Sequence, residues 1–347
     1  MICGYILRKM DMYRNGVITN IPRKESNFGT SDSRLFLVLR FTENKFHRTD
    51  PDTDINLAAN AGVTVFRMGI DWGRLVTKLP RSVSEARVQN VTALNRYREI
   101  VEKVKRAGMR PMVTLFHHSI PSWASEIGGW SNTTLKSYFA EFARDVSRNI
   151  DIGEDGFWVT FNEPTVFVLL TYCSGIWPPG PPQNMVNSLA CIAPYGTFYT
   201  AMNEIQAAHN MVYKILKLNS KADVGVAHNV GSHVPNSILD YIANNAADSM
   251  LTFPFIDAIK SNLDFCGLNY YGKEITKGSS VAILDTEEYS ESGRCVYPDG
   301  LYELLQRFND RYSKDDAAEF DYIITENGIS DATDVRSVSV LSHINPQ

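Results

Sequence analysis

Short apolar runs alternate with longer stretches of helical periodicity along most of this chain. Six runs are dominated by β-branched and aromatic residues, which predicts strands at residues 63–70, 111–116, 157–161, 224–227, 265–269 and 322–325. Between them apolar residues recur at spacings of three and four, which predicts helices at about residues 92–106, 133–148, 198–218 and 300–312. This alternation indicates an α/β fold with a parallel sheet covered by helices.

The same pattern predicts how the chain is organised. Residues 1–49 are expected to form an irregular segment, in which only residues 35–41 resemble a strand. Residues 50–347 are expected to form one (β/α) barrel domain, with the polar stretch 278–293 as a loop. Gly108 is expected to close the first helix, and Asn132 to cap the second. A closed (β/α)8 TIM barrel needs eight strands, so six clear strands predict an incomplete barrel.

Composition narrows the class of protein. The net charge is −5 and basic residues are not clustered, which argues against nucleic acid as a partner. No apolar run approaches the roughly 20 residues of a membrane-spanning helix, and the N-terminus shows no signal or transit pattern. The five cysteines are widely spaced and lack metal-site spacing, which predicts free thiols and no metal site: Cys3, Cys173, Cys191, Cys266 and Cys295.

Two predicted strands end in a glutamate. One string is Asn162-Glu163-Pro164 and the other is Thr325-Glu326-Asn327-Gly328. A retaining glycosidase needs one carboxyl to protonate the glycosidic oxygen and a second, roughly 5 Å away, to attack the sugar carbon. Glu163 is the expected acid and Glu326 the expected nucleophile, which must stay ionised. The alternative is that both are surface carboxylates that cap turns.

Several polar residues at or near strand ends are candidates to surround these carboxyls. Arg67 interrupts an apolar strand and therefore needs a partner, either the nucleophile or a structural ion pair. The hydroxyl of Tyr271 is a candidate hydrogen-bond donor to Glu326. Of His117 and His118, one is expected to face the site and the other to pack outward, because neighbouring strand residues alternate. Four tryptophans near strand ends are left unassigned, since core packing explains them equally well: Trp72, Trp123, Trp130 and Trp177.

Five separated motifs resemble those of glycoside hydrolase family 1, in the family's order. They are Arg67 with Asp71-Trp72-Gly73-Arg74, Thr114-Leu115-Phe116-His117, Thr160-Phe161-Asn162-Glu163-Pro164, Asn269-Tyr270-Tyr271 and Thr325-Glu326-Asn327-Gly328. The resemblance implies a retaining (β/α)8 enzyme with Glu163 as acid/base and Glu326 as nucleophile. It also implies a sugar site lined by His117, Asn162, Arg67, Asn269 and Tyr271.

The chain resembles one branch of that family more closely, the plant SENSITIVE TO FREEZING 2 galactolipid:galactolipid galactosyltransferases. The supporting strings are Phe116-His117-His118-Ser119-Ile120-Pro121, Thr252-Phe253-Pro254 and Tyr289-Ser290-Glu291-Ser292-Gly293-Arg294. The resemblance implies transfer of galactose between monogalactosyldiacylglycerol molecules, which yields oligogalactolipids and diacylglycerol. It further implies the chloroplast outer envelope, a membrane surface reached through the lipid substrate, and Mg²⁺ stimulation without a tightly bound cofactor. Relative to that branch, the chain is expected to be truncated at both ends.

Two alternatives remain beside galactosyl transfer. One is a soluble β-glycosidase that hydrolyses O-glycosides by the same first step. The other is an inactive barrel fragment, because the expected truncation removes the first and last strands. The products formed from a galactolipid separate transfer from hydrolysis, and a cooperative melting transition separates a folded enzyme from a fragment that does not fold.

Overall fold

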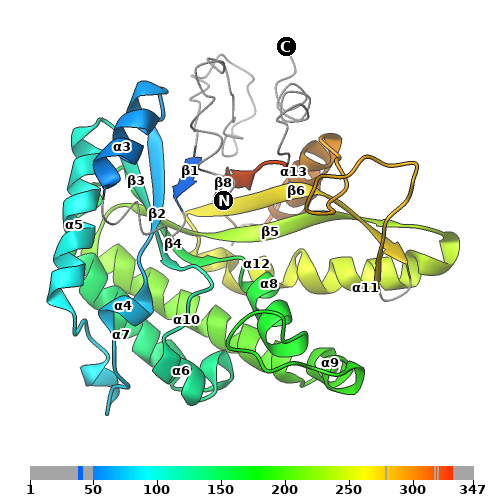
Figure 1. Ribbon diagram of the computed structural model, residues 1–347, viewed down its shortest axis with the longest axis horizontal. Coiled ribbons are helices and arrows are strands. Elements are labelled where there is room, and N and C mark those ends of the chain that lie inside the picture. Colours follow the sequence, from blue (N-terminus) through cyan, green and yellow to red (C-terminus); the bar gives the residue numbers. More distant parts are fainter. Residues whose placement is uncertain (1–37, 42–49, 278–279, 316–317, 319, 331–347) are drawn as a thin grey trace. The chain divides into compact units, whose positions relative to one another are not determined.

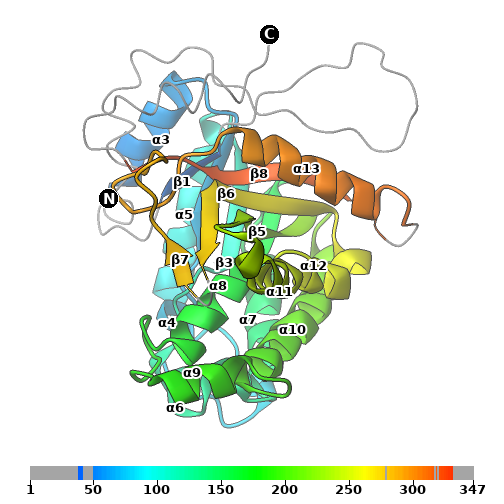
Figure 2. The ribbon, with the colours of Figure 1, turned by 90° about the vertical axis from the view of Figure 1, so that its right-hand side faces the viewer.

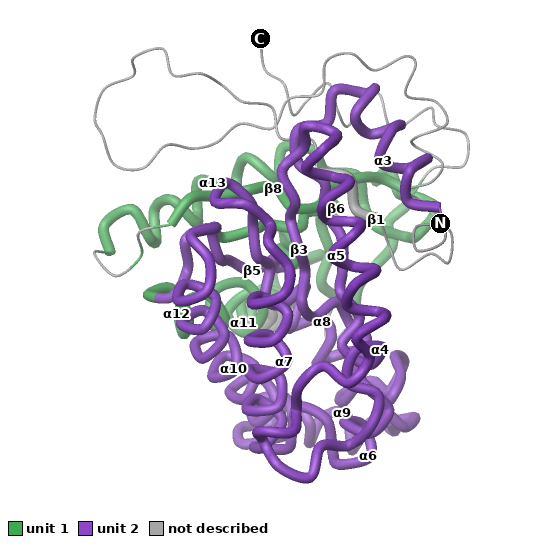
Figure 3. The backbone as a smooth tube through the Cα atoms, turned by 90° about the vertical axis from the view of Figure 1, so that its left-hand side faces the viewer, with its two compact units in different colours: residues 1–37, 229–261, 266–347 green, residues 38–228, 262–265 purple. Residues whose placement is uncertain are grey.

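The structure, a computed structural model, describes residues 38–41, 50–277, 280–315, 318 and 320–330 (Figure 1). By contacts the chain divides into two units (Figure 3). Unit 2 comprises residues 38–228 and 262–265, and unit 1 comprises residues 1–37, 229–261 and 266–347. Strands β5 and β6 each contribute residues to both units.

Unit 2 is built on parallel strands that follow one another in sheet order. Every neighbouring pair is parallel, with registers that place Val38 beside Val65 and Phe116 beside Phe161. The carboxyl ends of these strands therefore lie along one edge of the sheet. The strands are β1 (Val38–Phe41), β2 (Val65–Gly69), β3 (Arg110–Phe116), β4 (Phe157–Asn162) and the first part of β5 (Asp223–Pro235).

Helices alternate with these strands as the sequence predicts. The apolar stripe of α5 is buried at Leu94, Tyr97, Ile100, Val101 and Val104, the residues whose spacing predicted the helix. None of the described helices combines the length and apolar character needed to cross a bilayer. The helices of unit 2 are α3 (Pro51–Asn60), α4 (Trp72–Leu75), α5 (Val91–Arg106), α6 (Ser122–Glu126), α7 (Leu135–Asn149), α8 (Pro164–Val168), α9 (Met185–Ile192) and α10 (Thr197–Asn219), with the short 3-10 helices η2 (Val83–Glu85) and η3 (Gly129–Ser131) and the π-helix η4 (Leu169–Cys173).

One of the two predicted helix-end signals is confirmed. Gly108 follows α5 with a φ of 80°, a left-handed conformation that glycine adopts without steric cost. The prediction that Asn132 caps the next helix is wrong. Helix α7 begins at Leu135, and the Asn132 side chain instead accepts from the Thr134 amide and donates to the Ile127 carbonyl, so it stabilises the preceding turn.

Aromatic side chains fill much of the core of unit 2. Trp72, Trp130 and Phe139 lie with ring centroids 5.2–6.2 Å apart, and all three are buried. Trp123 packs edge-on against Trp72 and donates its indole N–H to the Val76 carbonyl. Three of the four unassigned tryptophans are therefore core residues, and each aromatic pair contributes about 0.5–1.5 kcal/mol beyond its buried area.

Unit 1 contains the later part of β5 with β6 (Phe265–Lys277), β7 (Ser280–Ala282) and β8 (Asp321–Asn327). In sheet order β6 lies between β5 and β7, and β8 also pairs with β6. Strands β5 and β6 continue well beyond the predicted ends at residues 227 and 269, and β7 lies within the predicted loop 278–293. The helices are η5 (Ile238–Asp240), α11 (Tyr241–Leu251), α12 (Pro254–Ile259), η6 (Lys260–Asn262, whose last residue belongs to unit 2) and α13 (Asp299–Tyr312).

The prediction that all cysteines are free is wrong for one pair. Cys173, at the end of η4, forms a disulfide with Cys191 in α9. The intervening connection folds back and brings the two Cα atoms to 5.2 Å, within the range that a disulfide spans. Spacing along the sequence does not reveal this approach. Cys266 and Cys295 are free and buried, and Cys3 lies outside the described residues.

His209, in α10, is a buried titratable residue that contacts Thr160 of β4. Its Nε2–H donates to the Asn262 carbonyl at 2.8 Å, which leaves Nδ1 to accept from the Thr160 hydroxyl at 2.7 Å. Complete burial lowers the pKa of the imidazole to about 4. Folding therefore favours the neutral form, and this contribution to stability is complete above pH 6.5 and is lost as the pH falls toward 4.

We therefore expect the free energy of unfolding to fall between pH 6.5 and 4, with His209 contributing up to about 3 kcal/mol of that loss. The comparison is with His209→Gln, whose amide can still donate to Asn262 but does not titrate. Denaturant titrations at pH 7, 5.5 and 4.5 measure both proteins. A pH dependence as steep in the variant as in the parent chain would contradict the assignment.

Candidate active site

Glu163 stands at the carboxyl end of β4 in an unusual backbone conformation. Its φ and ψ are 43° and 54°, in the left-handed region that residues other than glycine rarely adopt. Pro164 begins α8 directly after it, and a residue before proline is restricted in any case. The Glu163 N–H donates to the Ala227 carbonyl at 2.7 Å, and the side chain is buried. Backbone outliers of this kind concentrate at functional sites.

Arg67 lies on β2, buried, and reaches toward two neighbouring strands. Its Nε donates to the Thr114 hydroxyl at 3.1 Å and its Nη2 to the Asn162 Oδ1 at 2.6 Å. Because a guanidinium only donates, these contacts fix which end of the Asn162 amide faces Arg67. Asn162 is fully buried, so its Nδ2 must find an acceptor nearby.

The acceptor is a histidine. Asn162 Nδ2 lies 3.2 Å from His117 Nε2 and 3.5 Å from His118 Nε2. Since Nδ2 only donates, the His117 Nε2 must accept, which makes this ring neutral with its proton on Nδ1. The prediction that the two histidines point to opposite faces is wrong. β3 ends at Phe116, and His118 has a φ of 65°, so the chain turns and the two rings lie 4.9 Å apart.

Glu326 and Tyr271 form the corresponding pair in unit 1. The Tyr271 hydroxyl, at β6, donates to Glu326 Oε2, at β8, as the sequence predicts. A hydrogen bond donated to a carboxylate stabilises its ionised form, which a nucleophile requires. The side chain of Glu326 is buried.

The neighbours of Glu326 hold β8 against β6 on both sides. The Thr325 hydroxyl donates to Asn269 Oδ1 at 2.6 Å, and Asn327 Nδ2 donates to the Tyr270 carbonyl at 2.8 Å. Asn269 and Thr325 are both buried. Asn269 therefore bonds the residue directly before Glu326, and this hydrogen bond helps to orient the end of β8.

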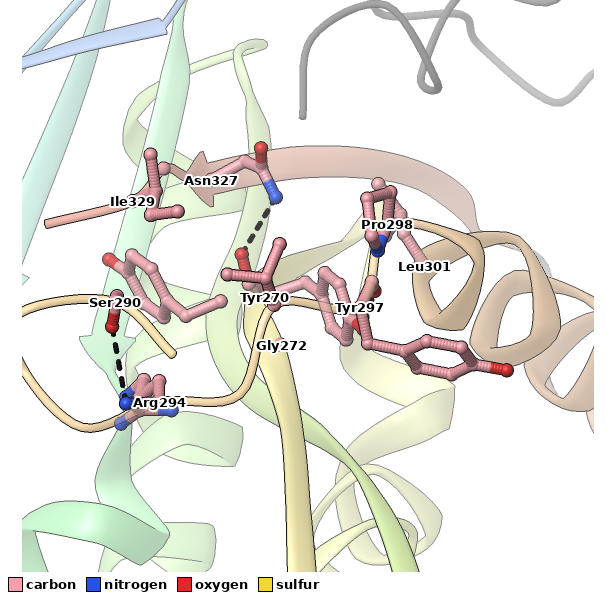
Figure 4. Close-up of a pocket in the computed structure, with 12 residues that line it drawn as sticks. Tyr270, Gly272, Ser290, Arg294, Tyr297, Pro298, Leu301, Asn327 and Ile329 are labelled. Carbon is pink, nitrogen blue, oxygen red and sulfur yellow. Dashed lines mark hydrogen bonds between the residues drawn. The ribbon is translucent and has the colours of Figure 1, made fainter. Parts of the chain in front are cut away.

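A pocket in unit 1 is lined by Tyr271 and by the residues that follow Glu326, Asn327 and Gly328 (Figure 4). The Arg294 guanidinium lies over the Tyr271 ring, 5.3 Å from its centroid, and its backbone N–H donates to the Ser290 hydroxyl. Figure 4 shows Ser290 and Arg294 on one side of the pocket, with Tyr297 on the other. The pocket is amphipathic, with polar and aromatic groups of the kinds that bind sugars.

The predicted site residues thus fall into two groups, one in each unit. Arg67, His117, Asn162 and Glu163 gather at the strand ends of unit 2, and Asn269, Tyr271 and Glu326 gather in unit 1. Sequence reasoning missed three participants. All three occur in the quoted motif strings, but no role was assigned to them. Thr114 and Thr325 are hydroxyls inside apolar strands, a signal that could have indicated a role, whereas the position of Arg294 over Tyr271 depends on the fold.

No three His, Cys, Asp or Glu side chains within the described part of the chain are placed to hold a metal ion. Stimulation by Mg²⁺ stays a prediction from the family resemblance, and the proposed chemistry uses only the side chains of this chain.

Comparison with known proteins identifies the family of this chain. The sequence model of the family described as "Glycosyl hydrolase family 1" matches residues 40–256. The chain is 43% identical over 301 residues to a rice protein named "Beta-glucosidase-like SFR2, chloroplastic" and 42% identical over 301 residues to an Arabidopsis thaliana protein named "Galactolipid galactosyltransferase SFR2, chloroplastic". Each match covers 85% of this chain, but 46% and 47% of the two relatives, so the chain spans about half their length.

Solved structures agree on the fold. The β-glycosidase from Pyrococcus horikoshii is 25% identical, and its match has a TM-score of 0.70 over 86% of this chain and 70% of that one. The sheet of alternating strands and helices is therefore that of a (β/α)8 TIM barrel, of which the described residues form an incomplete part. The chain belongs to glycosyl hydrolase family 1.

Proposed function

We propose that this chain catalyses retaining glycosyl transfer from a β-glycoside. The observation that carries the proposal is the hydrogen bond from Tyr271 to Glu326, which prepares an ionised carboxylate at a strand end. The Glu326 carboxylate attacks the anomeric carbon, the bond to the leaving oxygen breaks, and Glu163 gives that oxygen its proton. Glu163 then removes a proton from the incoming hydroxyl, which attacks the same carbon and releases Glu326.

The polar residues around the two carboxyls bind the hydroxyl groups of the sugar in this proposal. Asn162, held by Arg67 and bonded to His117, presents a fixed amide at the strand end that also carries Glu163. Fixed donors and acceptors of this kind bind sugar hydroxyls without reorganising. Asn269 and Tyr271 hold the region around Glu326 in the same way.

The proposed donor and acceptor are galactolipids, with the sugar hydroxyl of a second monogalactosyldiacylglycerol taking the place of water. Support comes from the printed name of the Arabidopsis relative, a galactolipid galactosyltransferase. Oligogalactolipids and diacylglycerol would be the products. The word "chloroplastic" in both relatives' names supports a chloroplast location, and we propose the outer envelope, where the enzyme meets its lipid at the membrane surface.

Hydrolysis is the second candidate. A protein named "Beta-glucosidase A" from Acetivibrio thermocellus is 27% identical over 326 residues, and its name describes cleavage of glucosides. Both reactions share the glycosyl-enzyme step and differ in the acceptor. Access of water therefore decides between them.

We expect Glu326 to carry the covalent intermediate. A 2-fluoro-2-deoxy-galactoside with a good leaving group should label the protein once per chain, because fluorine slows release of the sugar more than its attachment. Peptide mass spectrometry locates the label. A label on any peptide other than the one that contains Glu326 would contradict the role of nucleophile.

Glu163→Gln should lower turnover of substrates with poor leaving groups by about 10²–10⁴-fold, because an amide donates no proton to the leaving oxygen. Substrates with good leaving groups should lose less in their first step. Azide should partly restore turnover of the intermediate, since an anion needs no general base. Glu163→Asp serves as the control that retains a proton donor, and equal losses on all leaving groups without azide rescue would exclude the acid/base role.

Monogalactosyldiacylglycerol in detergent should yield oligogalactolipids together with diacylglycerol. Thin-layer chromatography and mass spectrometry resolve these products from free galactose. Free galactose as the main sugar product would favour the second candidate, hydrolysis. The Glu326→Gln variant should give neither product and shows that any turnover belongs to this site.

A further inference from the structure

The connection that follows Glu163 differs in charge from the rest of the chain. Residues 164–203 contain no Asp, Glu, Lys, Arg or His, although charged residues make up 21% of the chain. This stretch includes α8, η4, the Pro-rich turn and α9, and it extends into the first turns of α10. A surface connection without charge is unusual, since exposed segments normally carry charged side chains.

Large apolar side chains of this stretch are exposed. In α9, Met185, Val186 and Leu189 are 79%, 74% and 57% exposed. Their spacing places them on one face of the helix. Ile176 and Tyr195, which flank the helix, are 71% and 97% exposed. Figures 1 and 2 show α9 at the end of unit 2 opposite α3.

The rest of α9 is anchored. Cys191 is buried and bonded to Cys173, and the helix packs against α10 and η4. The exposed side chains are therefore held outward on a fixed support. We call the surface formed by Met185, Val186 and Leu189 the α9 face.

The chain segment that contains the α9 face also contacts the candidate active site, through Trp177. The Trp177 ring lies 4.6 Å from the His118 ring, measured between centroids, and the His118 ring adjoins Asn162. One uncharged segment thus begins directly after Glu163, contacts His118 through Trp177 and includes the exposed apolar side chains of α9. A substrate with a sugar at one end and acyl chains at the other matches this order.

We propose that the α9 face docks on the surface of a bilayer rich in neutral galactolipids. This inference rests on the proposed function and names the surface through which the enzyme meets its lipid. Helices that bind anionic lipids carry Lys and Arg on their polar side. α9 instead carries Asn187 and Ser188 beside its apolar residues, groups suited to the hydroxyls of uncharged sugar headgroups.

Flotation with vesicles tests the proposal. We compare vesicles of phosphatidylcholine with monogalactosyldiacylglycerol, phosphatidylcholine alone, and phosphatidylcholine with phosphatidylglycerol, each at low and high salt. The chain should float with the galactolipid vesicles, and binding should change less than twofold with salt because no charges are involved. Stronger binding to the anionic vesicles that disappears at high salt, or no binding to galactolipid vesicles, would overturn the proposal.

The test variant is Val186→Glu with Leu189→Glu, which should weaken vesicle binding at least tenfold. The matched control is Leu57→Glu with Leu218→Glu, which adds the same charge at two other exposed leucines of unit 2, 42% and 81% exposed, and should bind like the parent chain. If the charged test variant fails to melt cooperatively, Val186→Ser with Leu189→Ser replaces it. Equal binding by parent and test variant would refute the proposal.

Two further measurements separate docking from chemistry and from self-association. Hydrolysis of a soluble aryl β-galactoside should be the same in parent, test and control proteins. If the parent turns over no glycoside but still floats, the proposed function fails and the docking surface stands. Light scattering should give the same mass for parent and test variant. A dimer that the test variant dissociates, without vesicle binding, would identify a second copy of the chain as the occupant.

Discussion

The buried charge of Arg67 is the constraint on which the unit 2 half of the site depends. A guanidinium inside a sheet is costly unless each donor is satisfied, and here it bonds side chains from the two next strands, Thr114 on β3 and Asn162 on β4. Because Arg67 only donates, it fixes the orientation of the Asn162 amide. The amide Nδ2 then donates to His117 Nε2, so the proton of that ring lies on Nδ1. The charge of Arg67 therefore helps to orient three side chains, those of Thr114, Asn162 and His117.

The two carboxyls are held by different physical means. Glu163 is placed by its backbone, in a left-handed conformation between the end of β4 and a helix that begins with proline. Glu326 is placed by side chains, because Tyr271 bonds its carboxylate while its two neighbours bond β6. This difference fits their proposed roles. An acid/base that exchanges protons needs a fixed position, whereas a nucleophile needs a donor that stabilises its charge.

The sequence predicted the elements whose apolar pattern is continuous and missed those that depend on contacts between distant residues. Strands β2, β3 and β4 and helices α5 and α10 were expected within a residue or two at most of their ends. β5 and β6 continue through polar residues, where pairing with other strands supplies the hydrogen bonds that side-chain pattern does not reveal. The Cys173–Cys191 bond and the shared orientation of the two histidines both arise from turns that bring residues together. In the site, the strand-end glutamates were visible in sequence, whereas Arg294 required the fold.

Transfer and hydrolysis use the same two carboxyls. Which reaction dominates therefore depends on whether water or a sugar hydroxyl reaches the glycosyl-enzyme first. A glycosyl-enzyme in solution meets water at high concentration, and a lipid acceptor only when one diffuses to it. At a galactolipid surface the acceptor is held beside the site, and tethering of this kind raises its effective concentration to about the millimolar range or above. The segment after β4 contains both the contact between Trp177 and His118 and the exposed α9 face. Docking through that face would bring acceptor sugars to the site and exclude part of the water, which favours transfer without any additional catalytic group.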